Sequence, residues 1–109
     1  MAYDEELAKR IRDEIGAHPA LVEKKMFGGI AFMIHGNMSV GVAGDELMVR
    51  VGKENDEAAL ARPHVRPFDL SGRPMAGWVL VGADGTTADK DLASWIDTGV
   101  TYAESLPPK

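Results

Sequence analysis

The feature that most constrains the fold is a regular alternation of side chains between Lys25 and Val51, interrupted by two short turns. The turns are His35-Gly36-Asn37 and Gly44-Asp45, which contain residue types that β-hairpins favour. The segment therefore predicts three consecutive antiparallel strands. One parity holds the large apolar residues Ile30, Phe32, Ile34, Val40, Val42, Leu47, Val49 and Val51. Because successive side chains of a strand point to opposite faces, this set forms one apolar face.

The opposite face of the same strands is less polar than a solvated face normally is. It contains Ala31, Met33, Ser39, Gly41, Met48 and Arg50. Two interpretations stay open. Either a helix or the C-terminal tail of the same chain packs on this face, or the face is a dimer or partner surface, since methionine side chains adapt to different contacts.

Apolar residues at helical spacing predict three helices around these strands. The first covers residues 4–17 with Asp4 as its N-cap, the second covers residues 54–61, and Asp89 or Thr87 caps the third. The apolar positions of the first helix are Leu7, Ile11 and Ile15, and those of the third are Leu92, Trp95, Ile96 and Val100.

Two further strands are predicted at residues 65–70 and 75–81, which extends the sheet to five strands. The order is therefore helix, three strands, helix, two strands, helix. A chain of 109 residues has the usual size of one domain. We expect residues 1–109 to form a single α+β domain in two layers, an antiparallel sheet with the helices packed mainly on one face.

Composition restricts the function and the location of the chain. It contains no cysteine, which excludes disulfides, thiolate nucleophiles and cysteine-based metal centres. A formal net charge of -5 disfavours nucleic-acid binding except through a local basic patch. The acidic N-terminus lacks the features of a secretory signal, and no apolar run approaches the roughly 20 residues of a membrane helix. We therefore expect a cytoplasmic protein that has no membrane partner.

The sequence contains no recognisable catalytic or cofactor motif. Gly28-Gly29 is interpreted as a bulge or a close backbone approach in the first strand, because no phosphate-binding glycine pattern surrounds it. The histidines His18, His35 and His64 lack the spacing of zinc ligands. We expect no catalysis, no cofactor and no metal site.

Basic residues in the middle of the chain have two interpretations. They converge into an anion-binding patch, or they are surface charges that keep the strands soluble. They are Lys24, Lys25, Arg50, Arg62, Arg66 and Arg73. The candidate partner or anion surface combines three of these arginines with two methionines: Met33, Met48, Arg50, Arg66 and Arg73.

Five segments resemble the TfoX N-terminal domain family, which is associated with bacterial competence regulation. They are Lys25-Met26-Phe27-Gly28-Gly29-Ile30, Gly36-Asn37-Met38, Glu46-Leu47-Met48-Val49-Arg50-Val51, Val65-Arg66-Pro67-Phe68 and Met75-Ala76-Gly77-Trp78. The resemblance spans nearly the whole chain and implies a two-layer α+β fold. It implies a structural role for Met26, Phe27, Gly28 and Gly29, and it implies no catalytic residues. Longer competence regulators of the family carry a second domain that this sequence lacks, so a direct transcriptional role is not implied.

Three functions stay open at this point. The first is a stand-alone regulatory or partner-binding domain without catalysis, whose partner is another protein or a second copy in a homodimer. The second is a nucleic-acid accessory protein in transcription or competence regulation, based on the family association and the central basic residues. The third is a small enzyme or ligand carrier with a site around Arg50, His64 and Arg66.

Overall fold

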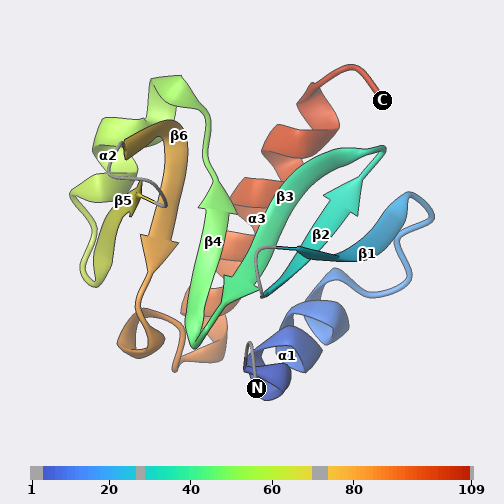
Figure 1. Cartoon of the computed structure of the whole chain (residues 1–109), viewed down its shortest axis with the longest axis horizontal. Coiled ribbons are helices and arrows are strands. Elements are labelled where there is room, and N and C mark those ends of the chain that lie inside the picture. The colour runs from blue at the N-terminus through green and yellow to red at the C-terminus, as the bar shows by residue number, and fades with distance from the viewer. Residues whose placement is uncertain (1–3, 27–28, 70–73, 109) are drawn as a thin grey trace.

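Six antiparallel strands form one sheet in the order β1-β2-β3-β4-β6-β5 (Figure 1). The strands are β1 Leu21–Met26, β2 Gly29–Ile34, β3 Asn37–Ala43, β4 Glu46–Arg50, β5 Val65–Asp69 and β6 Pro74–Val81. The computed structural model describes residues 4–26, 29–69 and 74–108. The predicted α+β class is confirmed, and the expected five strands were one too few.

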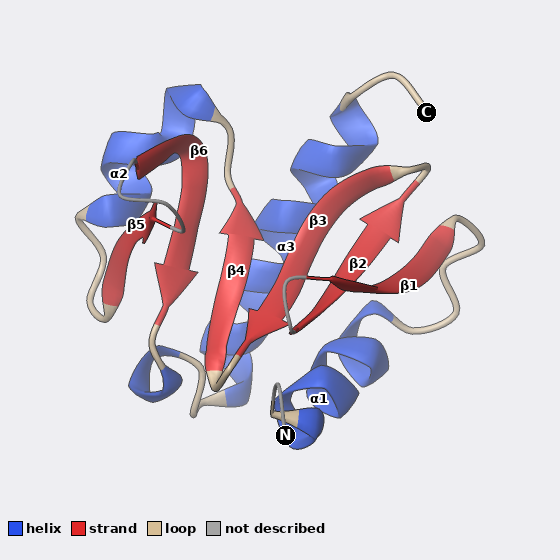
Figure 2. Ribbon diagram, viewed as in Figure 1, coloured by secondary structure: helices blue, strands red, loops and turns tan. Residues whose placement is uncertain are grey.

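The helices lie on one side of this sheet. They are α1 Glu5–Ile15, α2 Asp56–Leu60 and α3 Asp89–Ser105, with short 3-10 turns η1 Lys53–Asn55 and η2 Ala83–Gly85. Figure 2 shows α3 running behind β3 and β4, with α1 below β1 and β2. The side chain of Asp4 accepts hydrogen bonds from the N–H groups of Glu6 and Leu7 at 3.0 and 3.1 Å, which confirms the predicted N-cap.

The predicted cap of α3 is wrong. Ala88 occupies the N-cap position, and no side chain caps this end. Asp89 is already the first residue of the helix, while the Thr87 hydroxyl donates to the carbonyl oxygen of Ala83 at 3.2 Å. The Thr87 hydroxyl therefore stabilises the turn before the helix and does not cap the helix.

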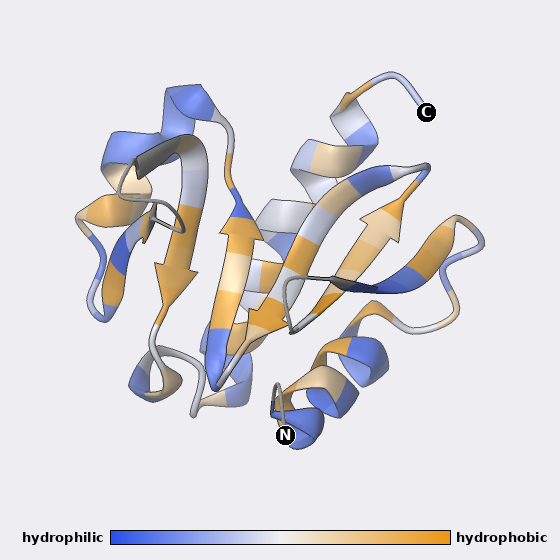
Figure 3. Ribbon diagram, in the orientation of Figure 1, coloured by the Kyte–Doolittle hydropathy of each residue, from blue (hydrophilic) through white to orange (hydrophobic). Residues whose placement is uncertain are grey.

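The main core lies between the helices and the sheet. Every residue of the predicted apolar strand face is buried. The helices contribute Leu7, Ala8, Ile11, Ala59, Leu92, Trp95 and Ile96 to this core. Figure 3 shows the corresponding hydrophobic segments along β2, β3, β4 and β6, with hydrophilic residues gathered at turns and on the outer helix surfaces.

Strand β1 is the element that the sequence did not predict. Residues 21–24 were expected to form the loop between the first helix and the first strand, and Lys25 and Met26 were expected to begin that first strand. The strand pairs with β2 over its whole length, from Leu21 opposite Ile34 to Met26 opposite Gly29. Phe27 and Gly28 lie outside the described residues. The close backbone approach is confirmed at Gly29, where an ideal Cβ would lie 2.0 Å from the carbonyl oxygen of Val42.

A register shift between β2 and β3 changes which side chains share a face. Val40 pairs with Phe32 and Met38 pairs with Met33, so the intervening Ser39 has no opposite residue. Ser39 is fully buried, and its hydroxyl donates to the carbonyl oxygen of Phe32 at 2.8 Å. The prediction that Ser39 lies on the same face as Gly41 therefore needs correction. The methyl group of Met38 takes that place, 3.1 Å from an ideal Cβ on Gly41.

Candidate functional site

The sheet face opposite the helices, which we call the open face, carries no helix in the described part of the chain (Figure 1). Cross-strand pairing places six residues in one row across all strands, because residues directly opposite in a sheet share a face. The row is Lys24, Ala31, Gly41, Met48, Leu80 and Arg66.

The centre of this row is a second, smaller core. Met48, Phe68 and Leu80 are buried there, with exposed fractions of 1, 3 and 6%. Met38, Ala43 and Trp78 pack against them. Met48, which the sequence placed on a partner surface, is therefore covered by neighbouring strand side chains. Neither a described helix nor the described tail forms part of this cluster.

A second row on the open face keeps apolar side chains partly exposed. Val22 is 54% exposed and pairs with Met33, which in turn pairs with Met38. Further across the sheet, Arg50 of β4 pairs with Trp78 of β6. We call Val22, Met33, Met38, Arg50 and Trp78 the half-exposed row. Of the two predicted surface methionines, Met33 belongs to this row and Met48 does not.

Arg50 lies against two aromatic rings. Its Cζ atom is 5.4 Å from the centroid of the Trp78 ring and 5.5 Å from that of the Tyr102 ring. Both distances fall within the roughly 6 Å range of a cation–π contact. Tyr102 comes from the last turns of α3 and reaches the end of β4 beside Gly52, where an ideal Cβ would lie 2.5 Å from Tyr102 Cε1.

Sequence reasoning missed Val22, Met38 and Trp78 of the half-exposed row, and it also missed Tyr102. Its helical spacing predicted only that it belongs to the last helix. A contact between the end of that helix and the end of the third predicted strand depends on how the helix crosses the sheet, which no local pattern encodes.

Those predicted basic residues that the structure describes are engaged in separate contacts. Arg66 forms a two-pronged ion pair with Glu46, with 3.1 Å between Arg66 Nε and Glu46 Oε2. Arg62 lies over the ring of Trp95, 3.7 Å from its centroid, on the helix side of the sheet. Lys24 and Lys25 are exposed on β1 and point to opposite faces. Arg73 lies outside the described residues.

The site proposed around Arg50, His64 and Arg66 is also divided. Glu46, His64, Arg66 and Asp84 border one open hollow beside β5. Arg50 is absent from its lining and stands at the other end of β4. No group of three or more histidine or acidic side chains within residues 4–26, 29–69 and 74–108 is arranged to hold a metal ion. Within the same residues, no helix combines the length and apolar character needed to cross a membrane.

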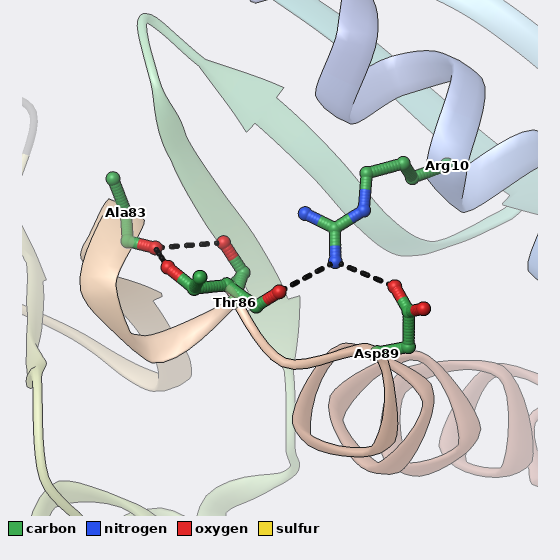
Figure 4. Close-up of polar contacts among 5 residues, drawn as sticks. Arg10, Ala83, Thr86 and Asp89 are labelled. Atoms are coloured by element: carbon green, nitrogen blue, oxygen red, sulfur yellow. Dashed lines mark hydrogen bonds and ion pairs between the residues drawn. The ribbon is translucent and has the colours of Figure 1, made fainter.

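A separate hollow lies where α1 meets the start of α3. Figure 4 shows Arg10 Nη2 donating to the carbonyl oxygen of Thr87 at 3.3 Å and to Asp89 Oδ1 at 3.1 Å. The Thr86 hydroxyl donates to the carbonyl oxygen of Ala83 at 3.2 Å in the same turn. Arg10, the cation that borders this hollow, therefore holds α1 against the start of α3. We interpret this junction as structural.

Charge is distributed unequally over the two sides of the molecule. The described open face carries Lys24, Arg50 and Arg66 against the single carboxylate of Glu46, which is bound to Arg66. Helices α1 and α3 carry eight acidic side chains against four basic ones: Glu5, Glu6, Asp13, Glu14, Asp89, Asp91, Asp97 and Glu104 against Lys9, Arg10, Arg12 and Lys90. The chain has a negative net charge, but its open face is locally basic.

The fold is a two-layer α+β domain with an antiparallel sheet that helices cover on one side. The chain belongs to the TfoX N-terminal domain family, whose model matches residues 13–103. The matched region extends from the end of α1 through most of α3 and confirms the resemblance in the sequence. Comparisons with curated proteins and with solved structures found no match.

Proposed function

We propose that this chain is a regulatory domain that binds a protein partner through the half-exposed row and performs no catalysis. The observation that carries the proposal is the half-exposed row itself. Tryptophan and arginine are enriched among the residues that dominate binding energy in protein interfaces. Here Trp78 and Arg50 pair with each other, and two half-buried methionines, Met33 and Met38, lie on the same face of the sheet.

Burial of these side chains by a partner supplies the driving force. Apolar surface removed from water contributes about 25 cal/mol per Å². The unbranched side chains of Met33 and Met38 can adjust to the shape of a partner at little strain. The rigid ring of Trp78 is already held in place by Phe68, with ring centroids 5.9 Å apart in an edge-to-face arrangement. Such a surface combines an ordered anchor with adaptable neighbours.

The charged groups of the face also suit recognition better than proton transfer. General acid and base chemistry requires a titratable group that is free to exchange a proton with a substrate. The carboxylate on the described open face, that of Glu46, is ion-paired with Arg66. The regulatory part of the proposal is supported by the association of the family with competence regulation.

Site-specific photocrosslinking in the cells that make this chain tests the proposal. A photoreactive amino acid replaces Met33 in the half-exposed row, and the matched control carries it at Lys90, an exposed position of α3. We expect discrete adducts with a different protein from position 33 and none of the same adducts from position 90. The same adducts from both positions, no adduct from either, or an adduct with a second copy of the chain would each overturn the proposal.

A further inference from the structure

We propose that the partner presents an acidic segment to the half-exposed row and that one of its carboxylates binds the guanidinium of Arg50. This inference rests on the proposed function and adds the chemistry of the partner. Three properties of the described residues support it: the state of Arg50, the charge of the open face, and the apolar side chains beside the guanidinium.

Arg50 differs from the other described arginines of the chain. Arg10, Arg12 and Arg66 each bind a carboxylate, those of Asp89, Glu23 and Glu46 respectively. Arg50 contacts the rings of Trp78 and Tyr102 instead, and among the described side chains no carboxylate lies within ion-pair distance of it. Arg62 is likewise placed over a ring, but on the helix side, away from the half-exposed row.

The contacts of Arg50 leave its hydrogen-bonding groups for a ligand. A guanidinium is planar, and its N–H groups donate within the plane while its faces stack on aromatic rings. Ring contacts therefore do not satisfy its donors. A carboxylate accepts two parallel hydrogen bonds from such a fork, and this charge-assisted pair is stronger than one between neutral groups. Trp78 and Tyr102 restrict the side chain, which reduces the entropy lost when the ligand binds.

The charges of the open face as a whole favour an acidic ligand. Lys24 and Arg66 lie on the same face, and the negative charge of Glu46 is balanced by Arg66. A two-fold dimer through this face would bring Arg50 and Lys24 of both copies into one interface, where like charges oppose association. Binding of this face to the helices of another copy would be a head-to-tail contact, because the helices cover the other side of the sheet, and such contacts lead to rings or filaments of many copies.

The apolar side chains on the same face as Arg50 define the rest of the segment. Val22, Met33 and Met38 are partly exposed apolar side chains in the same row. They suit a segment in which carboxylates alternate with leucine, methionine or aromatic side chains. A nucleic acid fits less well, since the net charge of -5 repels a phosphate backbone at long range.

Selection from a library of random short peptides displayed on phage tests the inference and does not require the partner to be identified. The baits are the wild-type chain, Arg50→Gln, Arg50→Lys and the control Lys9→Gln, which removes an exposed cation on α1 that pairs with Asp13. We expect wild type and Lys9→Gln to enrich peptides rich in aspartate or glutamate and apolar residues. Arg50→Gln should lose this enrichment.

Affinities of an enriched peptide make the test quantitative. Trp95 is buried and Trp78 is half-buried, so a change in fluorescence on peptide addition reports mainly on Trp78. Loss of a charged hydrogen-bond pair should raise Kd at least about tenfold in Arg50→Gln. Arg50→Lys keeps the charge without the planar fork and should lie between the two. Circular dichroism verifies that each variant is folded.

Several results would overturn the inference. These are no enrichment by the wild-type chain, enriched peptides without an acidic excess, or equal Kd values for wild type and Arg50→Gln. Binding of a single-stranded oligonucleotide that is steeply salt-dependent and weakened in Arg50→Gln would assign the site to nucleic acid instead. If position 33 crosslinks to a different protein but the phage selection enriches no acidic peptides, only the proposed acidic segment is rejected. If acidic peptides are enriched but position 33 gives no crosslink, only the proposed function is rejected.

Discussion

The guanidinium of Arg12 binds both carboxylate oxygens of Glu23 and so joins α1 to β1. Arg12 Nε lies 2.6 Å from Glu23 Oε2, and Arg12 Nη2 lies 2.8 Å from Glu23 Oε1. The hydrogen bonds from Arg12, helped by its charge, lower the pKa of Glu23 below its ordinary value, while partial burial acts in the opposite direction. This pair ties the edge strand that the sequence did not predict to the first helix.

Replacement of Glu23 by glutamine should make stability less dependent on pH. We expect Glu23→Gln to lower the free energy of unfolding by about 1 kcal/mol or less near neutral pH, because both partners are partly exposed. The folded pKa of Glu23 is below its unfolded pKa, so its contribution is complete above the unfolded value and disappears as the pH falls through the folded value. The difference in Tm from wild type should shrink accordingly in acid.

Thermal unfolding over a range of pH measures this effect. Glu14→Gln, an exposed change on α1, the helix that carries Arg12, serves as the matched control for altered net charge. A Tm difference for Glu23→Gln that stays constant from neutral to acidic pH would contradict the assignment.

The two methionines that the sequence placed together should respond differently to truncation. Met48 is 1% exposed in the second core, so Met48→Ala should lower the free energy of unfolding by about 2–5 kcal/mol. Met33 is only partly buried, and Met33→Ala should lower it by less than about 1 kcal/mol. Urea denaturation of the two variants provides the comparison. Equal losses would show that the second core does not separate Met48 from the half-exposed row.

Two glycines with positive φ allow backbone strain to be separated from a steric clash. Gly44 has φ 62° and open space around an ideal Cβ, so Gly44→Ala should cost about 1–2 kcal/mol from the left-handed backbone alone. Gly52 has φ 88°, and its ideal Cβ would lie 2.5 Å from Tyr102 Cε1. Gly52→Ala should therefore cost more.

Removal of the Tyr102 ring checks the steric part of that difference. In a Tyr102→Ala background, Gly52→Ala should cost about as much as Gly44→Ala. If the extra loss persists without the ring, contact with Tyr102 is not its cause.

The hydroxyl of Ser39 should be necessary for the register shift in β3. Ser39→Ala would leave the buried carbonyl oxygen of Phe32 without this hydrogen bond, and we expect a loss of about 1–3 kcal/mol. Ser94→Ala, at an exposed position of α3, is the control and should be nearly neutral. Denaturation measures the loss, and faster amide hydrogen exchange near Met38 would locate it. Similar stability of both variants would argue against the assigned role.

Much of the fold could be predicted because side-chain alternation is a local signal. The apolar face from Ile30 to Val51, the cap at Asp4 and the strand after Pro74 all follow from neighbouring residues. Strand β1 could not be predicted as a separate strand, because Glu23 and Lys24 interrupt its apolar pattern. It forms through pairing with β2 and through the ion pair with Arg12.

The candidate site was predicted in part. Alternation placed Met33, Met48 and Arg50 on one face, which the strand pairing confirms. It gave no means of telling the buried methionine from the partly exposed one. That difference arises because β6 lies beside β4 and brings Leu80 against Met48, together with Phe68 from β5.

Apart from the register shift at Ser39, the sequence alone determined which residues of each strand share a face, since the alternation of side chains is a property of the extended backbone itself. The tertiary structure decided which of those residues are covered and what surrounds the charged ones. The two aromatic rings that contact Arg50 belong to β6 and α3. They lie beside Arg50 because of the order of the strands in the sheet and the path of the last helix. Contacts between distant segments depend on the packing of the whole chain, and a local pattern does not encode them.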